Sequence, residues 1–147
     1  MPDELPLDDE AASLLRPALR LERFFPGRMT ARNARKLFPH SALCRYAPYE
    51  VVLAQGEESK DLHVICSGSV LITKTLGSAA VHLATLAKGD IFGEIALIRD
   101  GARVANAIAA EESRVFRLSL LDVQGLMAGN AELSEHLKRL AAERAEG

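Results

Sequence analysis

The sequence predicts a mainly β protein with flanking helices, built as an antiparallel β-roll of the jelly-roll kind. Short apolar segments with β-branched residues recur after Pro48, glycine-containing turns separate them, and helical patterns stand on both sides. Strands at this spacing form antiparallel sandwiches, barrels or rolls rather than βαβ units. The 147 residues suit one domain, since a chain of about 150 residues buries roughly 70% of its unfolded surface.

The N-terminal part divides into a predicted tail and two predicted helices. Residues 1–12 hold five acids and no base, and we expect them to form an acidic flexible tail. Helical spacing of apolar residues predicts a helix that begins near residue 13, with Pro17 in its first turn and Pro26-Gly27 at its end. Thr30 is placed to cap a second helix that stops before Pro39. The N-terminal helices are therefore expected over residues 13–38.

The β-roll is expected over residues 45–118, followed by two helices over residues 119–145. The predicted strands are Val51–Ala54, Leu62–Cys66, Ser69–Lys74, Ala80–Leu86, Ala105–Ala109 and Arg114–Leu118. Ser119 is placed to cap the first helix and Asn130 the second. In the second helix Leu133, Leu137 and Leu140 form one apolar stripe. Residues 13–147 are thus expected to form a single domain.

The composition excludes several classes of protein. No apolar run approaches the roughly 18 residues of a membrane span, and the acidic N-terminus does not fit a secretory signal. Cys44 and Cys66 are the only cysteines, and we expect reduced thiols in a cytoplasmic protein. The formal net charge of −2 gives no overall attraction to nucleic acid or anionic lipid.

The segment from Ile91 to Asn106 interrupts the strand series and carries the predicted chemistry. Glu94 opens a short helical turn whose first N–H groups lack partners within the helix, and Gly93 lets a ligand approach the backbone. Arg103 can fold back over this turn and grip a phosphate through two oxygens. A carboxylate beside the same anion is repulsive unless it binds a sugar hydroxyl. The residues indicate a phosphate-and-sugar site, and a structural Glu94–Arg103 ion pair is the alternative.

The segment FGEIALIRDGARVA, residues 92–105, resembles the phosphate-binding cassette of cyclic nucleotide-binding domains. Such domains occur in catabolite-activator regulators, cyclic-nucleotide-dependent kinases and cyclic-nucleotide-gated channels. Their pattern runs Phe-Gly-Glu, two residues, Leu, a short variable loop, Pro-Arg, one residue, Ala, and then Thr, Ser or Asn. This chain supplies in register Phe92, Gly93, Glu94, Leu97, Arg103, Ala105 and Asn106. The resemblance extends over roughly residues 38–145, because the turn glycines also correspond.

The resemblance implies a role for each matching position. Arg103 would bind the phosphate oxygens, Glu94 would accept from the ribose 2′-hydroxyl, and Gly93 would face the sugar. The N–H groups of Ala96 and Val104 would complete the phosphate site. The ligand-binding residues implied are Phe92, Gly93, Glu94, Ile95, Ala96, Arg103, Val104 and Ala105 in the cassette, Ile72, Ala84 and Leu86 as walls of the base, and Leu140 and Arg144 as its caps. For the three wall residues an ordinary core is the alternative, and for the two caps a solvated helix end.

Three positions depart from the family pattern or bear on selectivity. Ala102 replaces the usual proline before the arginine, and Tyr49 replaces a common turn glycine. Val104 stands where cGMP-preferring members often have a threonine whose hydroxyl binds the guanine amino group. Valine cannot make that bond, so we expect cAMP to bind at least as well as cGMP.

The expected function is therefore that of a cytoplasmic cyclic nucleotide sensor that signals by movement of its C-terminal helices. We expect no catalytic residue, no cofactor and no metal site, because the four histidines are scattered and His63 and His82 are expected at half-exposed strand positions. The ligand is expected to be cAMP, with cGMP possible, and the effector protein is unknown. A homodimer is open, since the final helix could pair with a copy of itself.

A ligand-independent interaction module on the same roll is the alternative function. Residues 11–45 carry eight bases against one acid, so the N-terminal helices could dock an acidic partner, although such charges also occur on solvated helix faces. Direct DNA binding is not expected, because the chain ends soon after the roll, before the helix-turn-helix domain that related transcription regulators append. A cupin-type metalloenzyme is disfavoured, because its strands carry paired histidines.

Overall fold

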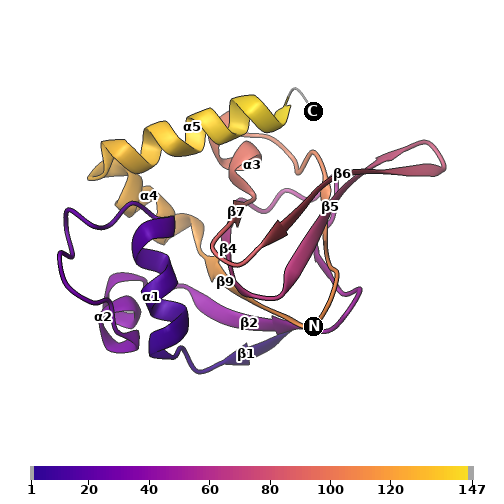
Figure 1. Cartoon of the computed structure of the whole chain (residues 1–147). Helices are drawn as coiled ribbons and strands as arrows, with labels where there is room; N and C mark the ends of the chain where they lie inside the picture. The colour runs from indigo at the N-terminus through magenta and orange to yellow at the C-terminus, as the bar shows by residue number, and fades with distance from the viewer. Residues whose placement is uncertain (1, 146–147) are drawn as a thin grey trace.

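Two antiparallel sheets form the centre of the computed structural model, which describes residues 2–145 (Figure 1). One sheet has the strand order β1-β2-β9-β4-β7 and the other the order β3-β8-β5-β6. The strands are β1 Asp3–Leu5, β2 Ala42–Tyr46, β3 Val51–Leu53, β4 Leu62–Ser67, β5 Ser69–Leu76, β6 Ala79–Ala87, β7 Ile91–Phe92, β8 Asn106–Ala109 and β9 Ser113–Leu118. The helices are α1 Asp9–Ala18, α2 Ala31–Leu37, α3 Glu94–Arg99, α4 Leu120–Ala128 and α5 Ala131–Ala145. The predicted fold class and all six predicted strands are confirmed, whereas β1, β2 and β7 were not foreseen.

The five-stranded sheet lies between two apolar cores. In β4, Leu62, Val64 and Cys66 pack with the helices, whereas Ile65 packs with the second sheet. Successive side chains of a strand point to opposite faces, so both faces of β4 are buried. This arrangement explains why Val64, Ile65 and Cys66 are apolar in succession, without the alternation of a half-exposed strand.

The prediction of a flexible tail over residues 1–12 is wrong for its described part. β1 pairs with β2, and the Asp8 side chain caps α1 by accepting from the Ala11 N–H at 2.8 Å. The helix therefore begins at Asp9 rather than near residue 13, and it ends at Ala18 rather than before Pro26. Acidic residues stabilise a helix N-terminus, and here Asp8, Asp9 and Glu10 lie at the start of α1. Pro17 lies in the last turn of the helix, not in the first.

The second N-terminal helix and both C-terminal helices form as predicted. Thr30 caps α2 by accepting from the Asn33 N–H, and Ser119 caps α4 in the same way. The Asn130 side chain accepts from the Leu133 N–H at 3.0 Å at the start of α5. The apolar stripe of α5 packs into the domain's own core, where Leu133 and Leu137 are fully buried. In Figure 1, α5 lies beside α3, and no helix within residues 2–145 has the length and apolar character needed to cross a membrane.

Candidate ligand-binding site

A cavity of about 380 Å³ lies where α3, the end of α5 and the β5–β6 hairpin meet. Twelve of the thirteen expected ligand-binding residues line it: Ile72, Ala84, Leu86, Phe92, Gly93, Glu94, Ile95, Ala96, Arg103, Val104, Ala105 and Arg144. Leu140 is the exception, because its side chain packs against the helical core and is not part of the cavity lining. With α5 in this position, Leu140 therefore does not reach the cavity.

The cavity also contains residues that sequence reasoning missed: Leu53, Lys74, Leu83, Arg99, Asn106, Ala107 and Glu143. Lys74 lies two residues after Ile72 on β5, so strand alternation could have placed it on the same wall. Strand alternation could not have placed Leu83 on this wall. Leu83 lies where the β5–β6 register shifts, and the position of that shift depends on how the two strands pair.

Arg103 is a buried cation whose hydrogen-bond partners among the described residues are neutral oxygens. Its side chain is tied to three neutral oxygens, with Nη1 donating to the Gly93 carbonyl at 2.8 Å, Nη2 to the Asp61 carbonyl at 2.8 Å and Nε to the Ser59 hydroxyl at 3.2 Å. The residue is 4% exposed, and burial lowers the pKa of its guanidinium. Within residues 2–145 it forms no ion pair. A guanidinium has five N–H donors, so two remain available to an anion in the cavity.

Gly93 positions this guanidinium through its carbonyl group. Its φ of 92° lies in the left-handed region, and it is the N-cap of α3. A Cβ atom at this position would lie 3.0 Å from the Asp61 carbonyl oxygen and 3.1 Å from Arg103 Nη1. Both the backbone conformation and the close packing therefore require glycine.

The loop before Arg103 is held by a lysine although it lacks the proline usual at position 102. Lys60 Nζ donates to the carbonyls of Ala96 at 3.4 Å and Gly101 at 3.2 Å, and it pairs with Asp100 at 3.1 Å. These contacts tie α3 and the loop that follows it to the segment before β4. The other departure from the pattern, Tyr49, has a φ of 67°, so the turn keeps the conformation that favours glycine.

Glu94 forms an ion pair with Arg144 rather than with Arg103. The carboxylate is 2% exposed, and Arg144, whose side chain is 30% exposed, also donates to the Ile91 carbonyl at 2.7 Å. Burial raises the pKa of Glu94, and the neighbouring Arg144 opposes this effect. The alternative of a structural ion pair between Glu94 and Arg103 is thus not found among the described contacts. Arg144 is not a solvated helix end either, because it joins the end of α5 to α3.

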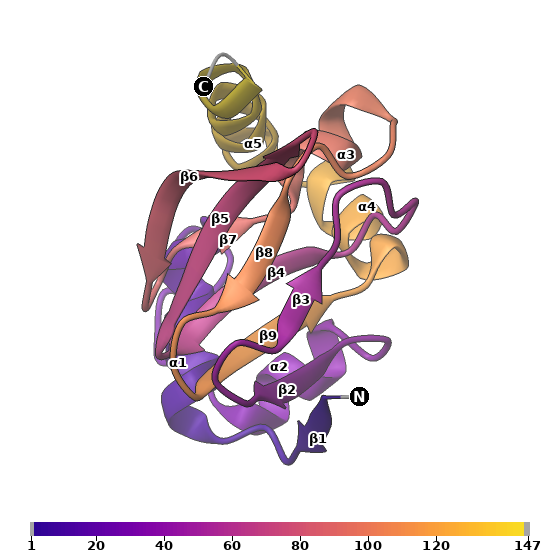
Figure 2. The ribbon, with the colours of Figure 1, turned by 90° about the vertical axis from the view of Figure 1, so that its right-hand side faces the viewer.

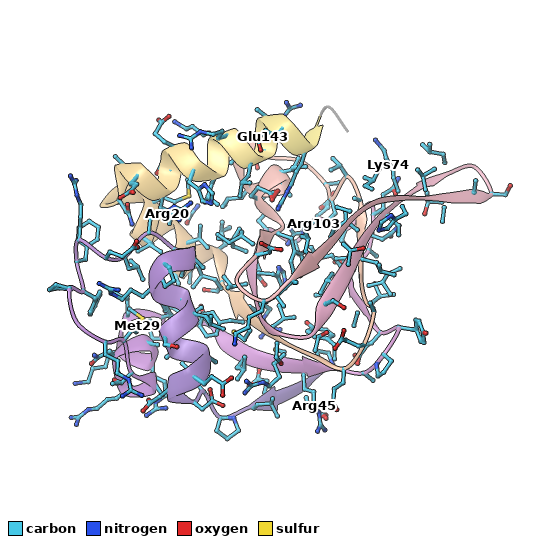
Figure 3. All side chains as sticks on the ribbon, in the orientation of Figure 1. Arg20, Met29, Arg45, Lys74, Arg103 and Glu143 are labelled. Carbon is cyan, nitrogen blue, oxygen red and sulfur yellow. The ribbon has the colours of Figure 1, made fainter. Side chains whose placement is uncertain are left out.

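The cavity combines a positive rim with an apolar wall. Lys74, Arg99, Arg103 and Arg144 contribute four cationic groups, against the carboxylates of Glu94 and Glu143. Figure 3 shows Arg103 in the interior, between Lys74 on the β5–β6 hairpin and Glu143 near the end of α5. The apolar wall comes from β5 and β6, where Ile72 lies opposite Ala84 and shares its face with Leu86. Ile72 and Leu86 also pack against the core between the sheets. They therefore belong to the hydrophobic core and line the cavity as well.

His63 lies beneath the site and is buried, so its prediction as a half-exposed residue is wrong. It is 2% exposed, its ring stacks on Phe92 with centroids 4.9 Å apart, and its Nδ1 has no hydrogen-bond partner in the described part of the chain. Burial lowers the pKa of His63 to about 3, helped by the nearby Arg103 charge. The described residues contain no group of three or more His, Cys, Asp or Glu side chains that could hold a metal ion.

Comparison with known protein families shows which family this chain belongs to. Residues 43–130, which include most of β2, the cassette and α4, match the family model described as "Cyclic nucleotide-binding domain". The chain belongs to this family. The resemblance predicted from residues 92–105 is therefore confirmed.

Individual relatives of this cyclic nucleotide-binding domain come from several kinds of protein. The chain is 31% identical over 100 residues to the cyclic AMP receptor protein of Thermus thermophilus, which covers 67% of this chain and 46% of the relative. It is 30% identical over 94 residues to a cAMP-dependent protein kinase regulatory subunit of Mycosarcoma maydis, covering 64% of this chain and 18% of the relative. The crystal structure of the Thermus thermophilus catabolite activator protein superposes with a TM-score of 0.67 at 27% identity, covering 77% of this chain and 54% of that one. The chain thus spans less than half the length of both curated relatives.

Proposed function

We propose that this domain is a cytoplasmic sensor that binds cAMP in the cavity and regulates a partner rather than catalysing a reaction. The observation that carries the proposal is Arg103, a buried cation that donates three of its five N–H groups to neutral oxygens and forms no ion pair within residues 2–145. A cyclic nucleotide offers one phosphate charge, a ribose hydroxyl and a flat base. The cavity offers a complementary group for each of these, and relatives named for cAMP support the choice of ligand.

The proposed pose follows from the chemistry of the lining. The phosphate lies on Arg103, the ribose 2′-hydroxyl donates to Glu94, and the base lies against the wall that includes Ile72, Ala84 and Leu86. The N–H groups of Ala96 and Val104 complete the phosphate site. A hydroxyl donor satisfies the buried Glu94 carboxylate without adding a charge, whereas the phosphate is kept on the cationic side.

The ion pair between Glu94 and Arg144 links the ligand to α5. When the ribose hydroxyl binds Glu94, Arg144 loses part of its attraction to that carboxylate and can move onto the base. The position of α5 then depends on whether the cavity is occupied, which is a population shift between two arrangements of the helix. We infer that the moving C-terminal helices carry the signal to an effector.

Calorimetric titration with cAMP and cGMP tests the binding proposal. Arg103→Ala should weaken cAMP binding by roughly 1.5–3 kcal/mol, the range for a hydrogen bond to a charged group. Arg45→Ala is the matched control, because Arg45 pairs with Asp3 on β1, away from the cavity, and its loss should leave the affinity unchanged. An Arg103→Ala variant with wild-type affinity would contradict the proposed site.

The same titration tests the choice of nucleotide. Val104 is 43% exposed on the cavity lining and has no hydroxyl for the guanine amino group. We therefore expect cAMP to bind at least as tightly as cGMP. Binding of cGMP about tenfold tighter, a difference of about 1.4 kcal/mol, would show that another residue supplies the missing hydrogen bond.

A further inference from the structure

The strand β6 is an unusually long open edge of its sheet. It has nine residues, Ala79–Ala87, whereas the other sheet edges β1, β3 and β7 have three, three and two. Figure 2 shows β6 as the outermost strand, and none of the described residues pairs with its free side. An edge strand presents unpaired N–H and C=O groups, which are a template for another extended strand.

The sequence around β6 lacks most of the devices that block such pairing. Residues 75–87 contain neither a charged residue nor a proline. The one protective feature is the register shift near Leu83, which interrupts the strand. The shift divides the edge into Ala79–His82, close to the tip of the hairpin, and Ala84–Ala87, next to the cavity wall.

Apolar side chains at this tip are also exposed. Leu76, Val81 and Leu83 are 57%, 41% and 38% exposed. In the β5–β6 register Leu76 lies opposite Ala79, and Val81 lies opposite Lys74, so these four residues share the face that continues into the cavity wall. The tip thus offers both unpaired backbone groups and an apolar surface.

We propose that β6 pairs with β6 of a second copy of this chain, antiparallel and about a two-fold axis. The chemistry of the edge favours a copy of itself, because both strands are neutral and neither brings a charge to the contact. Residues opposite one another in such a pair share a face, so Val81 lies opposite Val81 or Ala79 of the second copy. The two Lys74 side chains stand about three strand spacings apart, roughly 14 Å, which exceeds the screening length of about 8 Å at physiological ionic strength.

The α5 helix does not offer an equivalent surface. The sequence leaves open that the final helix pairs with a copy of itself, but its apolar residues Leu133, Leu137 and Ala141 are buried within the domain. The exposed residues of α5 include Glu132, Glu135, Lys138 and Arg139. The neutral edge of β6 is therefore the better contact between copies.

Sedimentation of the whole chain without nucleotide tests this inference independently of the proposed function. The apparent mass should rise with concentration from 15.9 kDa towards twice that value. Ala80→Lys should weaken self-association about tenfold, because the two new like charges then lie directly or diagonally opposite each other across the edge. Ala80→Thr, which adds no charge at the same exposed position, should associate like the wild type. Leu121→Lys, an equal charge change at an exposed residue of α4, should also leave association unchanged.

Hydrogen exchange locates the contact even if a variant folds poorly. In the wild type, the amides of residues 79–82 should exchange more slowly at high than at low protein concentration. A monomer at all concentrations up to about 1 mM would overturn the proposal. So would a dimer that Ala80→Lys leaves intact, or exchange in residues 79–82 that does not depend on concentration.

Discussion

Arg103 is held in position before any ligand arrives. Three neutral oxygens, from Gly93, Asp61 and Ser59, fix the orientation of its planar guanidinium. They accept from three of its five N–H groups but do not neutralise its charge, so the cost of burying the cation is only partly offset. An anion that enters the cavity is attracted by this uncompensated positive charge. Its binding does not cost side-chain entropy of Arg103, because the guanidinium is already ordered.

Gly93→Ala should damage both the fold and the site, because the new Cβ would displace Arg103. We expect a loss of about 1–3 kcal/mol in the free energy of unfolding, since φ is positive and the contacts are close. Affinity for cAMP should fall about tenfold or more, measured by calorimetry beside urea unfolding. Gly77→Ala is the control, with a φ of 64° and no atom within 4 Å of its Cβ. It should lose stability but keep the affinity. Equal affinities in both variants would show that the guanidinium does not depend on Gly93.

At the scale of elements, α5 is held to α3 by apolar packing and by one buried ion pair. Leu137 packs in the core beneath the helix, and Arg144 reaches Glu94 and the Ile91 carbonyl at its far end. Removal of one partner from such a pair leaves an uncompensated buried charge. The end of α5 therefore depends on a polar contact that lies inside the ligand cavity.

Arg144→Gln should loosen the end of α5 in the protein without nucleotide. Hydrogen exchange in the last two turns of α5 should become several-fold faster, because the buried Glu94 carboxylate loses its cation. Arg139→Gln on the exposed face of the same helix is the control and should exchange like the wild type. The double variant Glu94→Gln with Arg144→Gln should recover part of the protection. Unchanged exchange in Arg144→Gln would show that packing alone holds the helix.

At the scale of the whole molecule, acid should destabilise the fold through His63. Its pKa falls from 6.5 in the unfolded chain to about 3 in the fold, so the folded protein keeps the ring neutral. The unfolded chain then binds one more proton as the pH falls below about 6.5, and stability decreases by up to about 1.4 kcal/mol per pH unit until the pH approaches 3. Above that window the ring is neutral in both states and adds no pH dependence.

Urea unfolding at about pH 7 and pH 5 measures this loss. His63→Gln should show a smaller decrease in unfolding free energy between the two pH values than the wild type, whatever its absolute stability. His82→Gln, at an exposed strand position, should keep the wild-type decrease. Identical decreases in the wild type and His63→Gln would assign the acid sensitivity to other groups.

Much of the fold could be predicted because its signals are local. The turn glycines and β-branched segments marked six strands, and the caps at Thr30, Ser119 and Asn130 marked three helices. The acidic residues before α1 were misinterpreted, because a cap and a solvated tail have the same composition. Asp8 becomes a cap only when β1 pairs with β2 and the following chain can pack as a helix.

The sequence by itself determined the cassette, since Gly93, Glu94 and Arg103 stand close enough along the chain to imply one site. Only the tertiary structure decided the partners of these residues. Arg144 follows Glu94 by fifty positions, and His63 is buried because both faces of β4 are covered. Local patterns report backbone preference and chemistry. Burial and ion pairing depend on which distant segments the folded sheets and helices bring together.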